Sequence, residues 1–181
     1  MRPLLVVAVL AAGCTQPRHA PPPPKPAAPA LAPGLVVEFF DIGEELEDFP
    51  DVAERQPTVR RVDGQIDYEA TEEGFAGTDL ADFFYVRWTG VIRVPKDGRV
   101  RFTTDSDDGS RLFVDGQLVV DNGGLHPMEE QSGEIELKAG DHEFKVDLFE
   151  NGGGVGCRVY WQATGGAREI IPEAVLFHRK P

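Results

Sequence analysis

Apolar and polar residues alternate with a period of two through much of the chain. Phe84, Val86 and Trp88 fall on one side of such a segment, with Tyr85 and Arg87 on the other. The alternation recurs at Val100 with Phe102, at Ile135 with Leu137, and at Phe144 with Val146 and Leu148. A period of two is typical of strands that bury one face, because successive side chains point to opposite sides of a sheet. No segment after residue 10 shows a helical period, so we predict an all-β fold, an antiparallel two-sheet β-sandwich.

A tight hairpin is predicted in the middle of this pattern. Asp115 and Gly116 stand between the apolar segments 112–114 and 118–120. An Asp-Gly pair favours a two-residue hairpin turn, because both turn positions need a positive φ. We therefore expect two consecutive antiparallel strands around this pair.

The amino terminus has the pattern of an exported protein. Arg2 precedes a short apolar segment, residues 4–10, which is too short to cross a bilayer as a permanent helix and is typical of a secretory signal. The segment LAAGC at positions 10–14 resembles the lipobox of bacterial lipoproteins, which implies a signal peptide over 1–13 and a lipid on Cys14. The alternative is an ordinary signal with a chance cysteine. Thr15 replaces the aspartate that retains similar lipoproteins at the inner membrane, so an outer-membrane or cell-surface location is favoured.

A proline- and alanine-rich segment follows the signal. It extends to residue 33 and has little to bury, so we interpret residues 14–33 as the lipidated cysteine and a linker. Residues 34–181 then form one domain of ordinary size. If Cys14 carries lipid, Cys157 has no disulfide partner, and its alternation with Val159 and Trp161 predicts a buried thiol.

The charge of the chain limits its partners. Asp and Glu number 31 against 18 Lys and Arg, which gives a formal net charge of −13. Nucleic acid is excluded as a partner, because phosphate binding depends on Lys and Arg. The acidity is equally compatible with cation binding and with solubility alone.

An acidic loop stands directly before the predicted hairpin. It contains Asp107 and Asp108, followed by Gly109. Adjacent carboxylates on a loop are typical ligands for a hard cation such as Ca²⁺. The same residue types also make good turns without any ion. These residues alone leave both interpretations open.

The order of several motifs resembles the protective antigen-type domain family, which includes yeast flocculins and epithelial adhesins. The motifs are DFFYVRWTG at 82–90, SDDGSRLFVDG at 106–116, an opening strand GLVVEFF at 34–40, and the closing segments VYW at 159–161 and IPEAVLF at 171–177. The resemblance covers nearly all of the predicted domain and implies a β-sandwich.

The resemblance also implies a ligand site. In flocculins and adhesins an adjacent aspartate pair joined by a cis peptide binds Ca²⁺, and the ion holds two hydroxyls of a sugar. Asp107 and Asp108 match the pair, Asn151 matches an asparagine ligand in a second loop, and Gly153 and Val155 match two carbonyl donors. The glycine-rich second loop lacks the aromatic residue that flanks the sugar in adhesins.

These observations predict a non-enzymatic carbohydrate-binding module anchored in the bacterial cell envelope. Its ligand is expected to be a polysaccharide or cell-wall glycan bound through calcium, and its only membrane contact the lipid. The alternative is a structural module without metal, whose partner is another envelope protein. An accessory role beside a separate hydrolase is a third hypothesis. No serine, cysteine or carboxylate pair has an evident acid or base partner, so we expect no catalysis.

Overall fold

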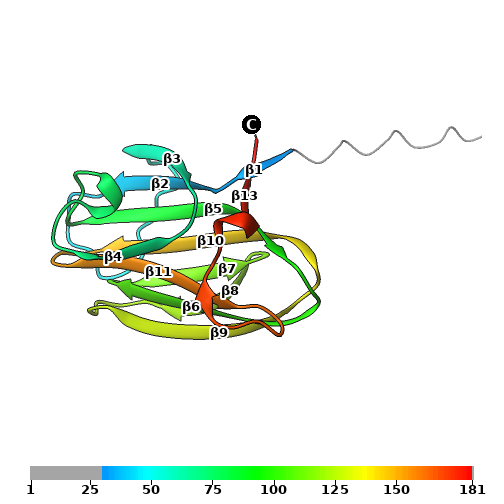
Figure 1. The fold of residues 1–181 in the computed structure, drawn as a ribbon. Helices are drawn as coiled ribbons and strands as arrows, with labels where there is room; N and C mark the ends of the chain where they lie inside the picture. The colour runs from blue at the N-terminus through cyan, green and yellow to red at the C-terminus, as the bar shows by residue number, and fades with distance from the viewer. Residues whose placement is uncertain (1–29, 181) are drawn as a thin grey trace, which may run out of the picture.

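Two antiparallel sheets packed face to face form the fold (Figure 1). The structure is a computed structural model that describes residues 30–180. The predicted all-β, two-sheet sandwich is confirmed. In the described part of the chain, only two single turns of 3₁₀-helix interrupt the strands, η1 (Phe75–Gly77) and η2 (Glu173–Val175).

Eight strands form the larger sheet, sheet A, in which β5 holds a central position. The order is β1-β13-β5-β10-β7-β8, and β2 pairs with both β5 and β3. The bounds are β1 (Leu31–Pro33), β2 (Leu35–Asp41), β3 (Val59–Asp63), β5 (Phe84–Val94), β7 (Ser110–Val114), β8 (Gln117–Asn122), β10 (Gly140–Glu150) and β13 (Leu176–Arg179). β5 and β10 pair along their whole length, from Phe84 with Glu150 to Val94 with Gly140.

Five strands form the smaller sheet, sheet B. The order is β12-β11-β6-β9, and β4 also pairs with β11. The bounds are β4 (Asp67–Thr71), β6 (Gly98–Asp107), β9 (Glu129–Leu137), β11 (Val155–Gln162) and β12 (Glu169–Ile170).

The hairpin predicted at Asp115 and Gly116 is confirmed. These two residues connect β7 to β8 and have φ angles of 50° and 77°. The Asp115 carboxylate also accepts hydrogen bonds from the backbone N–H of Glu143 and from His142, at 2.9 Å and 2.7 Å. The turn is therefore tied to the start of β10.

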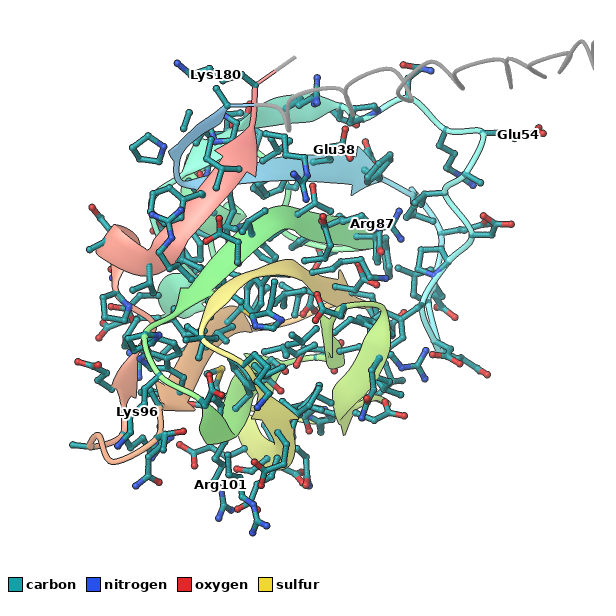
Figure 2. All side chains as sticks on the ribbon, turned by 90° about the vertical axis from the view of Figure 1, so that its right-hand side faces the viewer. Glu38, Glu54, Arg87, Lys96, Arg101 and Lys180 are labelled. Atoms are coloured by element: carbon teal, nitrogen blue, oxygen red, sulfur yellow. The ribbon has the colours of Figure 1, made fainter. Side chains whose placement is uncertain are left out.

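The core lies between the two sheets and contains the side chains expected from the alternation. Trp88 and Phe102 are completely buried, and Trp161 is 4% exposed. Burying an aromatic side chain of this kind contributes about 1.5–3 kcal/mol. Cys157 is also buried, as predicted, and burial raises the pKa of its thiol. Charged residues such as Glu54, Lys96 and Arg101 extend from the surface (Figure 2).

A second apolar cluster lies on the outer face of sheet A. It contains Phe40, Tyr85 and Phe149 from the strands, with Leu46 and Val52 from the segment that joins β2 to β3. This segment, residues 42–58, covers what would otherwise be an exposed aromatic patch. It thereby reaches the end of β10, where the acidic loop also lies.

The β10–β11 connection and strand β1 lie at opposite ends of the sandwich (Figure 1). The strand register supports this placement. Glu150 pairs with the first residue of β5, whereas β13 pairs with Val91 and Ile92 near the other end of β5. β1 then pairs with β13. The chain therefore enters the domain at the end opposite the β10–β11 connection.

The sheet begins at Leu31, three residues before the expected boundary at Gly34, because β1 pairs with the carboxyl-terminal strand β13. The predicted signal peptide and the predicted lipidation site, Cys14, lie outside the described residues. Within residues 30–180, no helix has the length and apolar character needed to cross a membrane.

Candidate metal centre

The acidic loop joins β6 to β7 and places two carboxylates side by side. Asp107 is the last residue of β6, and the peptide bond from Asp107 to Asp108 is cis. Gly109 follows and packs against Phe149, whose ring carbon would lie 2.4 Å from a Cβ at this position. The backbone N–H of Phe149 donates to the Gly109 carbonyl at 2.9 Å. A side chain at position 109 is therefore excluded by the end of β10.

Glu150, the last residue of β10, lies beneath this loop. Its side chain is completely buried, and its carboxylate accepts hydrogen bonds from the backbone N–H of Asp108 at 3.1 Å and of Gly152 at 2.6 Å. Burial, followed by the charge of Asp108, raises the pKa of Glu150 to about 8, although both N–H donors act in the opposite direction. Burial and the negative charge of its neighbour disfavour the ionised form of Glu150. A cation bound nearby would stabilise that ionised form.

Asp108 is held firmly by backbone donors. It is 7% exposed, and its two oxygens accept hydrogen bonds from the N–H groups of His126 and Asn151, each at 3.0 Å. These bonds connect three loops, because His126 precedes β9 and Asn151 precedes β11. The orientation of the Asp108 carboxylate is therefore fixed by the backbone around it.

Asp107 is the open member of the pair. Its side chain is partly exposed, and no hydrogen bond or ion pair to its carboxylate occurs among residues 30–180. Burial, followed by the charge of Asp108, raises the pKa of Asp107 above its ordinary value. A Cβ added to Gly154 would lie 3.4 Å from one Asp107 oxygen, so the glycine-rich loop passes close to this carboxylate.

The three carboxylates converge. Ligand oxygens of Asp107, Asp108 and Glu150 all lie within 4.8 Å of one another. Oxygens of this kind suit Ca²⁺, which takes six to eight oxygen ligands at about 2.3–2.6 Å. This set of three carboxylates therefore fits a hard divalent cation.

The other ligands expected from sequence occupy the same region. The Asn151 side-chain oxygen accepts a hydrogen bond from the backbone N–H of Leu46 at 2.7 Å, so it holds the 42–58 segment. Gly153 donates its N–H to Asp82 at 3.1 Å, and Val155 is the buried first residue of β11. Metal coordination by Asn151, Gly153 and Val155 stays a prediction.

Glu150 was missed by the sequence reasoning, although a signal existed. The inward-facing residues of β10 are Phe144, Val146 and Leu148, and Glu150 continues that alternation. An acidic residue in phase with a buried apolar face needs a compensating partner. The compensation comes from backbone N–H groups, including that of Asp108 in the acidic loop, which no local pattern places beside β10.

A two-sheet β-sandwich with an acidic loop at one end defines the class of this protein, and the chain belongs to the PA14 domain family. The model of the PA14 domain matches residues 31–174.

Similar proteins share this domain within different contexts. The chain is 31% identical over 121 residues to the anti-sigma-I factor RsgI3 of Acetivibrio thermocellus. The matched region covers 65% of this chain and 18% of that protein. The chain is also similar to an anti-sigma factor domain-containing protein from Clostridium clariflavum, at 27% identity and a TM-score of 0.69, covering 83% of this chain and 48% of the other. The PA14 sugar-binding domain from an RTX adhesin has a TM-score of 0.70 at 23% identity, over 81% of this chain and 98% of that domain. The chain thus spans less than one fifth of the curated relative.

Proposed function

We propose that this protein is a non-enzymatic carbohydrate-binding module that recognises polysaccharide or cell-wall glycan through Ca²⁺. Asp107 and Asp108 would hold the ion, with Asn151 and the carbonyls of Gly153 and Val155 as further ligands. The observation that carries the proposal is the convergence of the Asp107, Asp108 and Glu150 oxygens within 4.8 Å.

Electrostatics supports a cation at this position. The three carboxylates repel one another, and no Lys or Arg forms an ion pair with any of them among residues 30–180. A divalent ion would neutralise this repulsion in a partly buried site, where charges interact more strongly than in water. Glu150 then supports the site from below by accepting the Asp108 N–H.

The exposure of Asp107 supports an open site. Asp108 and Glu150 face the protein interior, whereas Asp107 is partly exposed and lies beside a glycine-rich loop. An ion held from below by carboxylates keeps coordination positions directed toward solvent, where two neighbouring sugar hydroxyls can bind. The RTX adhesin domain of the same fold, described as sugar-binding, agrees with this assignment.

The position of the site supports anchoring in the envelope. The acidic loop lies at the end of the sandwich opposite β1, where the chain enters the domain. A lipid on Cys14, followed by the proline-rich linker, would direct the site away from the membrane. We propose the outer membrane or the cell surface as its location.

Glycan binding with and without calcium tests the proposal. Wild type, Asp107→Asn and the matched control Asp97→Asn are applied to a glycan array in Ca²⁺ and in chelator. Asp97 is exposed and lies in the β5–β6 turn, at the end of β5 opposite the pairing of Phe84 with Glu150. We expect wild type and Asp97→Asn to bind in Ca²⁺ only, and Asp107→Asn to bind in neither. Binding that is equal in calcium and chelator contradicts the proposal.

A second function has one observation in its favour. Backbone N–H groups already satisfy both Asp108 oxygens, and Leu46 occupies the Asn151 oxygen. The loop is therefore hydrogen-bonded without an ion, as a structural or protein-interaction module requires. Binding of an envelope protein by wild type and Asp107→Asn alike, with no glycan bound, would favour this function.

A further inference from the structure

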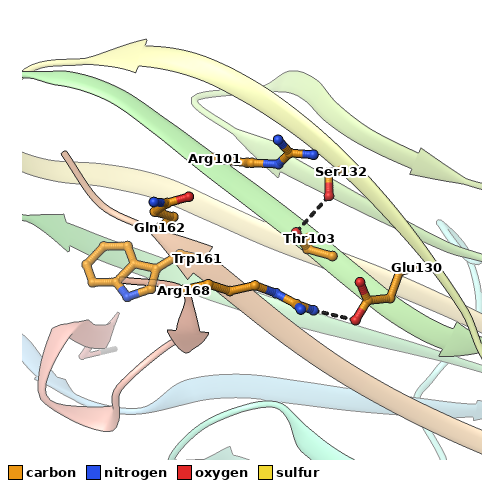
Figure 3. A pocket seen from close by; sticks show the side chains of 7 residues that line it. All are labelled: Arg101, Thr103, Glu130, Ser132, Trp161, Gln162 and Arg168. Carbon is orange, nitrogen blue, oxygen red and sulfur yellow. Dashed lines mark hydrogen bonds and ion pairs between the residues drawn. The ribbon is translucent and has the colours of Figure 1, made fainter. Parts of the chain in front are cut away.

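The outer face of sheet B contains a depression whose shape follows from strand register. Thr103 on β6 pairs with Tyr160 on β11 and with Ser132 on β9. Thr103 and Ser132 are short, and their hydroxyl oxygens lie 2.8 Å apart (Figure 3). The adjacent outward rows carry the longer side chains of Arg101 and Glu130. The two hydroxyls therefore form the floor of a depression of about 270 Å³.

Arg168 forms one wall of this depression. Its guanidinium carbon lies 4.0 Å from the centre of the Tyr160 ring, and it pairs with Glu130 on the far strand (Figure 3). Because Arg168 precedes β12 and Glu130 belongs to β9, this contact crosses the face of the sheet. Arg101 and Gln162 line the other side.

The depression continues along β6 in one direction. A second depression of about 310 Å³ shares Arg101 and Gln162 and extends to Thr164 beyond β11. In the other direction, the ion pair of Arg168 with Glu130 crosses the face at the level of Asp105, with which Glu130 pairs in register. The two depressions therefore form one groove that leads along β6 away from the candidate metal centre.

The polar groups of the groove suit a neutral sugar. Arg101, Arg168 and Gln162 donate hydrogen bonds, Glu130 accepts them, and the Thr103 and Ser132 hydroxyls do both. A sugar hydroxyl is both a donor and an acceptor, so it can hydrogen-bond with both kinds of group in the groove. Each arginine that lines the groove is already paired with a glutamate, so a carboxylate or phosphate would have to compete with those pairs. The pairs are Arg168 with Glu130, Arg101 with Glu134, and Arg99 with Glu134 and Glu136.

We propose that this groove binds a neutral polysaccharide chain, so that the protein recognises several consecutive sugar units rather than a terminal sugar alone. The polysaccharide extends along β6 from the Thr103–Ser132 floor toward Thr164. The choice of a glycan as the ligand rests on the proposed function, whereas the contacts of the groove itself need no ion.

Affinity electrophoresis tests the groove with defined probes. Wild type migrates through gels that contain xylan, β-glucan, mannan or galactan, with polygalacturonate as the acidic probe. Calorimetry then uses fragments of increasing length from the neutral polysaccharide that retards it most. We expect affinity to rise with fragment length. Retardation by no neutral polysaccharide, or by polygalacturonate alone, overturns the proposal.

Ser132→Phe fills the floor of the groove, and Gln117→Phe is the control. Both positions are exposed on strands, but Gln117 belongs to β8 of sheet A and lines neither depression. We expect Ser132→Phe to bind long fragments about threefold to tenfold more weakly, and Gln117→Phe to bind them as wild type does. Gln162→Ala, at another exposed position, is a second variant with the same expected direction. Wild-type affinity of Ser132→Phe and Gln162→Ala for long fragments overturns the proposal.

The two proposals fail in different ways. If the metal site is wrong and the groove is right, chelator leaves wild-type binding unchanged while Ser132→Phe still weakens it. If the groove is wrong and the metal site is right, chelator abolishes binding and Ser132→Phe has no effect. Circular dichroism of each variant confirms that the sandwich is intact.

Discussion

Glu150 accepts a hydrogen bond from the backbone N–H of Asp108, 3.1 Å away, although the residues are 42 positions apart in the chain. This contact fastens the acidic loop of β6–β7 to the end of β10. In the opposite direction, the Asp108 carboxylate accepts a hydrogen bond from the backbone N–H of Asn151 at 3.0 Å. The two loops of the candidate metal centre therefore hold each other in place.

Close packing at Gly109 predicts a specific destabilisation. In Gly109→Ala the new Cβ would lie 2.4 Å from the Phe149 ring and 3.0 Å from the Gly124 carbonyl oxygen. We expect the free energy of unfolding to fall by about 1–3 kcal/mol, as for other overpacked sites. Urea denaturation measures this change in the free energy of unfolding. Gly123→Ala is a milder control, because its Cβ would lie 3.2 Å from the end of the Asp121 side chain. Equal stability of the two variants would contradict the contact.

A buried carboxylate organises the other end of the core. Asp63 accepts hydrogen bonds from Trp88 at 3.1 Å, from the Tyr68 hydroxyl at 2.6 Å and from Arg61 at 2.8 Å. Asp63→Ala leaves the indole and phenol donors without this acceptor, so we expect a loss of about 3 kcal/mol in chemical denaturation. Asp67→Ala removes an exposed partner of Arg158 and should cost at most about 1 kcal/mol.

The hairpin turn predicts a pH-dependent contribution to stability. Burial alone would lower the pKa of His142, but its hydrogen bonds to Asp115 and to the Lys138 carbonyl outweigh this, so the pKa is raised above 6.5. A raised pKa means that the folded state binds the proton more tightly. The stabilisation is therefore complete below pH 6.5 and is lost as the pH rises through the folded-state pKa.

Asp115→Asn isolates this pair, because Asn-Gly preserves the turn while removing the charge. We expect wild type to exceed the variant in melting temperature at pH 5.5 and the difference to shrink at pH 8.5. A difference that is constant with pH would show that the imidazolium–carboxylate attraction contributes nothing.

Asn151 connects the second loop to the 42–58 segment. Asn151→Ala removes the acceptor of the Leu46 N–H, so stability in chelator should fall by about 1 kcal/mol. If Asn151 is also a ligand, the affinity for Ca²⁺ falls as well. Unchanged calcium affinity together with lower stability would assign the side chain a structural role only.

The sequence predicts the local features of this fold and few of the distant ones. The alternation around Trp88 and Phe144 indicates β5 and β10, and Asp115-Gly116 indicates the β7–β8 turn, because each depends on neighbouring residues. The insertion of β10 between β5 and β7 depends on packing and has no local signal. The same holds for the site: Asp107 and Asp108 are adjacent in sequence, whereas Leu46 and Asn151 meet across 105 positions.

Calorimetric titration of the metal-free protein with Ca²⁺ tests the central claim most directly. Wild type and Asp107→Asn are compared, because the partly exposed Asp107 carboxylate accepts no hydrogen bond among residues 30–180 and its replacement leaves the surrounding hydrogen bonds intact. We predict saturable binding of one ion by wild type and a loss of at least about tenfold in affinity in the variant, equivalent to about 1.4 kcal/mol. No binding heat with wild type, or equal affinities of the two proteins, would contradict the account.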